Sequence, residues 1–337
     1  MRPGLAVGAL LTLSSCNWIA TARHAIGYPT VARGEAANLA VADSVLYATL
    51  AQEGLAVLSG TPLHELHRVA PPARMESVDA VVVADGMLFA LDARPPGHLA
   101  VYSLADPLAP RLLAPPRPVP VGPFSGVSAA SGIAVVSGGT SRLTAWRYDR
   151  SGLQDSVPFA TLDLGRGQPN ALVSHDGRVI YVATHRKGPH FWLDLVRVTG
   201  DRLEPAGALE LEGAGFTAGG AKPANFPIAL AELGADTLLV ADGAGLAVVE
   251  VSRPAAPVLR TVIPLEGSGV GLTLNGTRAL VSVAGKQPAL VLFDCSKGLR
   301  GPIRLIALPP GTFPLGVALI RSSIAVAARQ RGVLGFE

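Results

Sequence analysis

The sequence predicts an all-β fold built from seven copies of one unit, and three observations predict it. Pairs of short apolar segments, separated by turns rich in glycine or proline, recur along the chain. Their spacing is about 42 to 47 residues, with one spacing near 58, which is the length of a four-stranded propeller blade. The units fill nearly the whole chain without a linker. We therefore expect a seven-bladed β-propeller of four-stranded antiparallel blades.

The clearest unit lies at residues 238–258, LLVADGAGLAVVEVSRPAAPV. Its two apolar runs are too short for helices and lack helical spacing, and an Asp-Gly-Ala-Gly turn separates them, so they predict a β-hairpin. Side chains that are apolar at almost every position indicate strands buried on both faces. Weaker copies begin at residues 46, 88, 133, 180, 280 and 324.

The blades are expected in chain order over residues 35–72, 73–118, 119–165, 166–222, 223–266, 267–310 and 311–337. Ala, Gly and Val, which suit the crowded axis of a propeller, dominate the expected innermost strands at 39–42, 80–83, 126–129, 171–174, 228–231, 270–274 and 316–320. The last blade has three strands, and residues 24–32 form a strand without a blade. Pairing that N-terminal strand as the outer strand of the last blade would close the ring and remove exposed sheet edges.

Residues 1–15 have the composition of a signal peptide. Arg2 supplies a positive segment, and residues 5–15 are apolar but too short to span a bilayer. The segment Leu13-Ser14-Ser15-Cys16 resembles the bacterial lipoprotein signal, in which the chain is cleaved before the cysteine and the thiol is diacylated. The resemblance implies lipidation of Cys16, and we then expect a tether over 16–22 and a single propeller domain over 23–337. An ordinary secretory signal that contains a cysteine is the alternative.

Composition favours a buried core without a disulfide. Hydrophobic residues make up 49% of the chain, yet no apolar stretch of about twenty residues follows the leader, so the excess serves a core. Cys295 is the only other cysteine, and acylation of Cys16 would leave it unpaired. We interpret Cys295 as a small buried hydrophobic side chain.

Two units carry a longer motif. Residues 246–258 are Leu-Ala-Val-Val-Glu-Val-Ser-Arg-Pro-Ala-Ala-Pro-Val, and residues 99–110 are Leu-Ala-Val-Tyr-Ser-Leu-Ala-Asp-Pro-Leu-Ala-Pro. Both resemble the LVIVD repeat, a bacterial cell-surface propeller repeat in which Leu-Val-Ile-Val-Asp precedes Ser-Asp-Pro and a second proline. The resemblance implies an extracytoplasmic scaffold and brings no catalytic residue. The proline pair itself forbids helix and shapes the turn into the outer strand.

Blade topology sorts the loops onto two faces. Turns between the second and third strands, and connections from one blade to the next, lie on what we call the upper face, where propellers usually bind ligands. Cations in these turns outnumber Glu53, Asp92 and Asp242. We expect a basic rim that binds an acidic protein or an anionic glycan, the alternative being solvated loop tips without a ligand. The candidate rim residues are Arg94, Arg142, His185, Arg186, Lys187, His190, Lys286, Arg329 and Arg331.

The sequence contains no motif for a cofactor, a metal or a catalytic nucleophile. A glycine-rich insertion at 213–223 does not end in Gly-Lys-Ser/Thr, and there is no Gly-x-Ser-x-Gly. His64 and His67 are three residues apart on a probable strand, so we expect their side chains on opposite faces. Two cations between His185 and His190 disfavour a metal there. A net charge of +3 without a basic-aromatic stripe gives nucleic acid binding no support.

The sequence therefore predicts a lipoprotein of the bacterial envelope that acts as a non-catalytic binding or assembly scaffold. An aspartate directly after the acylated cysteine would retain such a lipoprotein in the inner membrane. This chain has Asn17 at that position, which favours the outer membrane. The alternative is an extracytoplasmic propeller hydrolase, similar to lactonases, acting on a small anionic substrate in the central channel. That enzyme would use residues around the channel mouth, namely Asn170, Arg186, His190 and Asn225.

Overall fold

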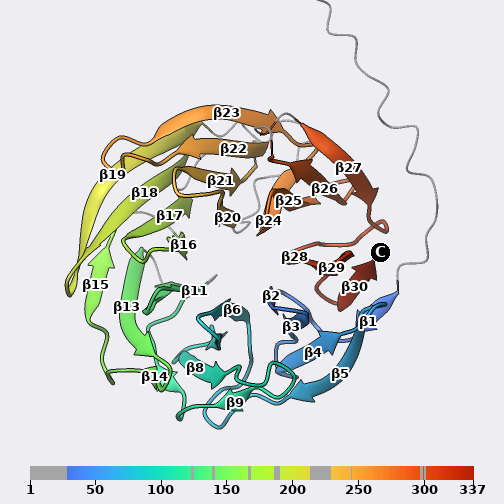
Figure 1. Ribbon diagram of the computed structural model, residues 1–337, viewed down its shortest axis with the longest axis horizontal. Helices are drawn as coiled ribbons and strands as arrows, with labels where there is room; N and C mark the ends of the chain where they lie inside the picture. The colour runs from blue at the N-terminus through green and yellow to red at the C-terminus, as the bar shows by residue number, and fades with distance from the viewer. Residues whose placement is uncertain are drawn as a thin grey trace, which may run out of the picture.

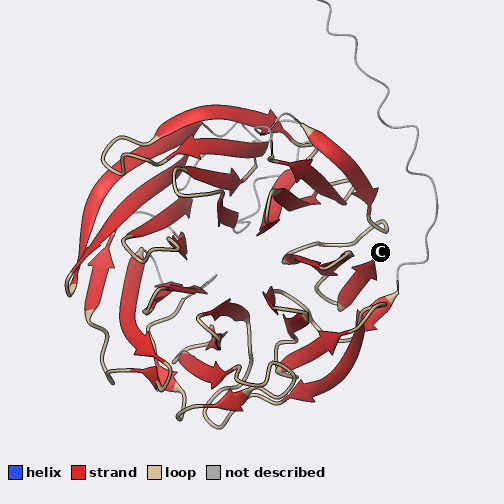
Figure 2. Cartoon of the chain, in the orientation of Figure 1, coloured by secondary structure: helices blue, strands red, loops and turns tan. Residues whose placement is uncertain are grey.

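The computed structural model describes residues 29–122, 125–138, 141–165, 168–185, 190–212, 229–243, 245–296, 299 and 301–337. These residues form seven antiparallel sheets that stand around a central axis like the blades of a propeller (Figure 1). Figure 2 shows that the described chain consists of strands and loops and contains no helix, and thus none that could span a membrane. The predicted seven-bladed β-propeller is confirmed.

In the first three blades the strands follow one another from the axis outward. Blade one contains β2 (Leu39–Ala42), β3 (Val45–Thr49), β4 (Leu55–Ser59) and β5 (His64–Val69). Blade two contains β6 (Ala80–Ala84), β7 (Met87–Asp92), β8 (His98–Ser103), β9 (Arg111–Leu112) and β10 (Arg117–Pro118). Blade three contains β11 (Gly126–Ala130), β12 (Ile133–Gly138), β13 (Arg142–Asp149), β14 (Gly152–Leu153) and β15 (Ala160–Asp163).

The other four blades follow the same order. Blade four contains β16 (Gln168–Val173), β17 (Val179–His185), β18 (His190–Thr199) and β19 (Arg202–Glu212). Blade five contains β20 (Ala229–Glu232), β21 (Thr237–Ala241), β22 (Gly245–Glu250) and β23 (Val258–Pro264). Blade six contains β24 (Ser268–Asn275), β25 (Arg278–Ala284), β26 (Ala289–Asp294) and β27 (Pro302–Ala307). Blade seven contains β28 (Val317–Ile320), β29 (Ser323–Ala327), β30 (Val333–Phe336) and β1 (Thr30–Ala32).

The N-terminal strand closes the ring as predicted. β1 pairs antiparallel with β30, placing Thr30 opposite Leu334 and Ala32 opposite Val333. The chain then crosses to blade one, and two backbone hydrogen bonds of 2.9 Å join Ala36 to Arg329. Strands from the two ends of the sequence thus share one sheet, and β30 is paired along both of its edges.

The outer position is irregular in blades two and three. β9 and β10 share the outer edge of β8, and β14 and β15 share that of β13, where one continuous strand was expected. In blade two, Pro115 and Pro116 lie between the two segments. Because proline has no N–H to donate, a continuous ladder cannot form there.

The core lies between the blades. Seven clusters of buried apolar side chains each join two adjacent blades around the ring. β3 and β7 are buried at every position, as strands covered on both faces must be. Cys295 belongs to the cluster between blades five and six, and burial raises the pKa of its thiol, which bears out its interpretation as a small buried side chain.

Candidate functional site: the upper face

The upper face carries the described residues of the predicted rim. The antiparallel strand order places the turn between the second and third strands of every blade on one side of the ring, together with the connections between blades. Arg94 and Lys286 lie in such turns, Arg142 begins the strand after one, and Arg329 and Arg331 lie in the turn between β29 and β30. Except for those last two, the rim residues come from different blades and are spread around the ring (Figure 1).

Several predictions fall outside the described residues. Arg186 and Lys187 do so, as do the insertion at 213–223 and Cys16 with the whole leader. His185 ends β17 and His190 begins β18, and only their backbone is described. The lipid anchor and the blade-four part of the rim therefore remain predictions.

The described rim cations are accessible. Arg142, Lys286, Arg329 and Arg331 are exposed, and Arg94 is half-buried. The Arg331 side chain donates through Nη2 to the Pro310 carbonyl at 3.1 Å, and the Arg329 guanidinium lies 5.4 Å from the centroid of the Phe313 ring. Arg94, Arg142 and Lys286 form no ion pair with any described residue.

The carboxylates of the same face serve the fold. Asp92 is buried and accepts hydrogen bonds from the Glu76 N–H at 2.8 Å and the Ser77 hydroxyl at 2.9 Å. Asp242 is buried and accepts from the N–H of Gly245 at 3.2 Å, within the turn of blade five. Such bonds to internal donors fix the loops and direct the negative charge inward.

Two exposed carboxylates are also engaged. Ser141 donates to Asp163, and this hydrogen bond is the main cause that lowers the pKa of the Asp163 carboxyl. Glu53 forms an ion pair with Arg68, whose Nη2 donates to the carbonyl oxygen of Arg33 at 2.9 Å. Glu53 is thus paired within the fold, whereas Asp163 stays exposed opposite Arg142 and offsets part of the rim charge.

The connections between blades carry further charges, which a count over the turns alone does not include. Exposed carboxylates of the upper face without an ion pair to a described residue are Glu35, Glu76, Asp163 and Glu266. Cations without an ion pair to a described residue are more numerous, because the connections add two arginines to the rim. They are the exposed Arg33, Arg74, Arg142, Lys286, Arg329 and Arg331, and the half-buried Arg94. The described part of the upper face therefore presents a positive surplus.

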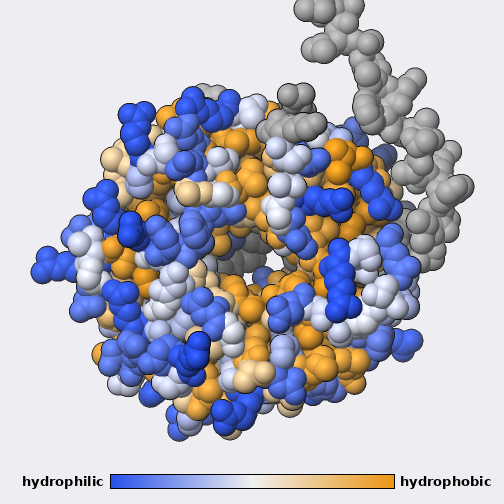
Figure 3. All heavy atoms as spheres, in the orientation of Figure 1, coloured by the Kyte–Doolittle hydropathy of each residue, from blue (hydrophilic) through white to orange (hydrophobic). Residues whose placement is uncertain are grey.

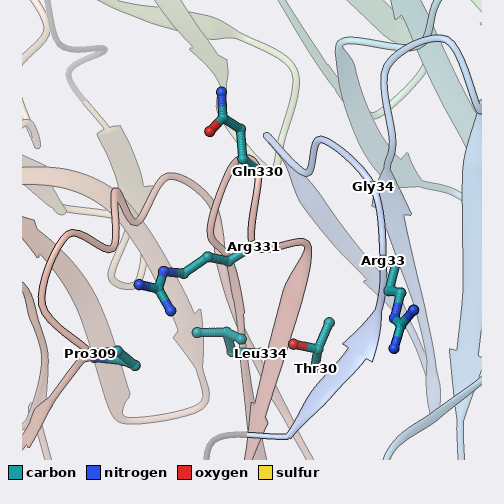
Figure 4. A pocket seen from close by; sticks show the side chains of 7 residues that line it. All are labelled: Thr30, Arg33, Gly34, Pro309, Gln330, Arg331 and Leu334. Carbon is teal, nitrogen blue, oxygen red and sulfur yellow. The ribbon is translucent and has the colours of Figure 1, made fainter.

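A cavity of about 490 Å³ opens where the ring closes. Three segments distant in sequence contribute its lining: Thr30, Arg33 and Gly34 from β1 and the chain after it, Pro309 from the connection between blades six and seven, and Gln330, Arg331 and Leu334 from blade seven (Figure 4). We call it the seam cavity. Sequence reasoning missed it because Arg33 precedes the first blade and no single repeat contains the site.

The central channel is mainly apolar. Figure 3 shows hydrophobic atoms along much of the central opening, while hydrophilic atoms gather on the periphery. On the described innermost strands Glu232 is the single ionisable residue, and it accepts hydrogen bonds from the His175 N–H at 2.8 Å and the Tyr181 hydroxyl at 3.3 Å. Of the residues that a hydrolase was expected to use, Asn170 lies on β16, whereas Asn225 and Arg186 lie outside the described residues.

One expectation about histidines is wrong. A bulge in β5 places His67 opposite Val57 and His64 opposite Ser59, so the two histidines lie on the same face of the sheet. The His64 ring forms a hydrogen bond of 3.1 Å with the Pro62 carbonyl. Within the described ranges, no cluster of His, Cys, Asp or Glu could hold a metal ion.

Comparison with known proteins supports the fold. No family model matches the chain, and no curated protein matches its sequence. The WD40 β-propeller domain of Doa1 is similar with a TM-score of 0.62 and 13% identity, over 92% of this chain and 97% of that chain. The computationally designed protein Ika8 is similar with a TM-score of 0.58 and 10% identity, over 89% and 83%. Identities this low show the propeller fold alone.

Proposed function

We propose that this protein is a binding or assembly scaffold that captures an acidic partner with its upper face. The observation that carries the proposal is the unequal use of charge there. Asp92 and Asp242 bind donors inside the fold, whereas Arg142 and Lys286 extend into solvent without an ion pair to a described residue. Free cations around one face attract anionic partners and speed their encounter. An acidic protein surface or an anionic glycan has the matching charge.

The same proposal places the protein in the bacterial envelope, anchored by a lipid on Cys16. The Leu-Ser-Ser-Cys pattern supports the anchor, the two LVIVD-like units support an extracytoplasmic scaffold, and Asn17 supports the outer membrane. β1 runs antiparallel to β30 and therefore toward the upper face. An anchor before β1 would hold the lower face near the membrane and leave the upper face free for a partner.

The anchor is tested with Cys16→Ala in the protein's own cells. We expect the wild type to fractionate with membranes and partition into detergent, and the variant to lose both properties because it lacks the acyl chains. If the wild type is already soluble, or if the variant partitions like it, the leader is an ordinary secretory signal.

The rim is tested by charge reversal. Arg142→Glu with Lys286→Glu changes two exposed side chains of the upper face. The matched control, Arg253→Glu with Arg321→Glu, makes the same change in net charge on lower-face turns. After crosslinking and pull-down from the envelope, we expect the upper-face variant to lose partner capture, and the control to keep it.

Capture should also weaken with salt, since exposed charges are screened within about 8 Å at physiological ionic strength. Both variants should keep the melting temperature of the wild type, because surface substitutions away from internal contacts change stability little. Equal capture by the two variants, or capture that does not respond to salt, would contradict the basic-rim proposal.

A further inference from the structure

The seam cavity has the chemistry of an anion site, and it shares Arg331 with the rim. Arg33 and Arg331 supply two guanidinium groups to its lining, and none of its lining residues is a carboxylate. In Figure 4 the side chains of Leu334 and Thr30 lie between these two guanidinium groups. A ligand that meets both arginines must therefore carry two separated anionic groups.

We propose that the seam cavity binds a small organic dicarboxylate, with one carboxylate at Arg33 and the other at Arg331. The planar guanidinium fork matches a carboxylate with two parallel hydrogen bonds. A short aliphatic spacer would lie over Leu334, where the Thr30 hydroxyl faces the same space and is available to a carboxylate oxygen, whereas the Gln330 amide points away from the other lining side chains (Figure 4). The site and its ligand do not depend on the proposed scaffold function.

The volume of the cavity favours an organic molecule over an inorganic ion. At about 490 Å³ it lies within the range of roughly 300–1,000 Å³ that small-molecule pockets occupy. Phosphate or sulfate would meet one guanidinium and fill only a small part of that volume.

The fold holds the walls of the cavity before any ligand arrives. Arg68 binds the Arg33 carbonyl at 2.9 Å and is itself held by Glu53 and Glu65, so the Glu53 carboxylate, which lies beside Gly34 of the lining, is paired with Arg68. On the other side, the hydrogen bond from Arg331 Nη2 to the Pro310 carbonyl at 3.1 Å orients that guanidinium. Walls that are already ordered reduce the entropy lost on binding.

Nearby charges also favour an anion. Arg329 is exposed in the same turn as Arg331 and adds a third positive charge. Glu35 is exposed two residues beyond Arg33 but does not line the cavity. The seam therefore keeps a net positive charge at the place where the ligand would sit.

The test is calorimetric titration of the purified propeller with succinate, glutarate and adipate. Butyrate is the matched probe with one carboxylate, and inorganic phosphate is the generic anion. We expect one dicarboxylate of suitable length to bind with a stoichiometry of one, at least tenfold more tightly than butyrate or phosphate, because only it meets both arginines. Its binding should raise the melting temperature, since the site exists only in the closed ring.

Variants assign the site. Arg33→Gln and Arg331→Gln should each weaken dicarboxylate binding about tenfold or more, which is the usual loss for one charged hydrogen-bonded contact. Arg321→Gln, on the lower face of the same blade, removes the same charge and should bind like the wild type. If Arg331→Gln fails to fold without its bond to Pro310, Arg33→Gln still decides, because the Arg33 side chain forms no ion pair with a described residue.

Three outcomes would overturn the proposal. The first is that no dicarboxylate binds at millimolar concentration, and the second is that Arg33→Gln binds as tightly as the wild type. The third is tight binding of a glutamate-rich peptide without binding of the free acids, which would make the cavity part of a protein interface. The rim-reversed variant Arg142→Glu with Lys286→Glu should still bind the dicarboxylate, so a failure of the scaffold proposal is distinguishable from a failure of this one.

Discussion

Three tyrosine hydroxyls join neighbouring blades. Tyr47 donates to the Pro107 carbonyl at 2.6 Å, Tyr148 to Asp85 Oδ2 at 2.7 Å, and Tyr181 to Glu232 at 3.3 Å. In each case the acceptor belongs to the adjacent blade. Burial is the main cause that raises the pKa of all three phenols, so these tyrosines act as neutral donors across the blade interfaces.

Replacing one of these tyrosines tests its contribution to stability. Tyr148→Phe removes the bond to Asp85 and keeps the ring against Phe89, whose centroid lies 4.8 Å away. Because Asp85 is exposed, we expect the free energy of unfolding to fall by about 1 kcal/mol. Tyr102→Phe is the control, since the Tyr102 ring is buried but its hydroxyl has no bond to a described residue, and its loss should change little. Denaturant unfolding measures both, and equal effects would assign the loss to the ring environment.

The sequence located the described rim residues but not their surroundings. Arg94, Arg142 and Lys286 could be assigned to the upper face because the repeat period fixes which turn each belongs to. The role of Asp92 could not be predicted from the sequence, because its hydrogen bonds to Glu76 and Ser77 join the second strand of a blade to the connection that precedes that blade. A charge count from sequence therefore treats a buried structural carboxylate as if it were free.

The closing strand β1 is an element whose geometry depends on one glycine. Gly332 has φ +76°, and a Cβ added there would meet the carbonyl oxygen of Ala32 well inside van der Waals contact. Gly86 has a similar φ of +72°, and a Cβ there would have open space around it. A substitution at Gly86 therefore introduces backbone strain alone, whereas one at Gly332 introduces the same strain and a collision with β1.

Substitution by alanine exploits this difference. Gly86→Ala should lower the free energy of unfolding by about 1–2 kcal/mol, the usual penalty for a left-handed L-residue. Gly332→Ala should lower it further and should speed amide hydrogen exchange in β1 and β30, because the strand pair must separate to fit the methyl group. Equal losses for the two variants, with unchanged exchange at the seam, would mean that β1 contributes no more to closure than an ordinary turn.

Elements differed in how well the sequence predicted them. The two middle strands of each blade are apolar on both faces, and their position next to neighbouring blades makes that pattern strong, as in β21 and β22. Outer strands have one solvated side and carry a weaker signal. Their interruptions in blades two and three, and the bulge that brings His64 and His67 onto one face, depend on local pairing that the alternation of residues does not encode.

At the scale of the molecule, the ring creates sites that no repeat contains. The seam cavity joins residues near both ends of the sequence, because β1 and β30 share a sheet. The lower face shows the same principle, where Ser131 donates to the His175 carbonyl at 2.6 Å and the His175 N–H in turn reaches Glu232 in the following blade. The repeats in the sequence predict the propeller fold, whereas contacts of this kind between blades follow only from how the ring closes.

The whole propeller should lose stability at both ends of the pH range. Hydrogen bonds from Ser151, from Ser141 and from Arg260 are the leading causes that lower the pKa of Asp149, Asp163 and Glu250 respectively. These carboxyls bind protons more weakly in the folded state. Their contribution is therefore full above the unfolded values of about 4 and is lost as the pH falls through the lower folded values.

The buried tyrosines have the opposite effect on the pH dependence of stability, because they destabilise the fold at high pH. Burial raises the pKa of Tyr102 to about 12 and raises those of Tyr47, Tyr148 and Tyr181 as well. The unfolded chain then loses its phenolic protons near pH 10, before the folded one does, so stability is full below about pH 10 and falls as the pH rises through the folded values. Urea midpoints measured from about pH 2 to 12 should show a plateau with two descending limbs. Tyr148→Phe should make the alkaline limb shallower, and a limb of unchanged slope would show that this phenol does not drive alkaline unfolding.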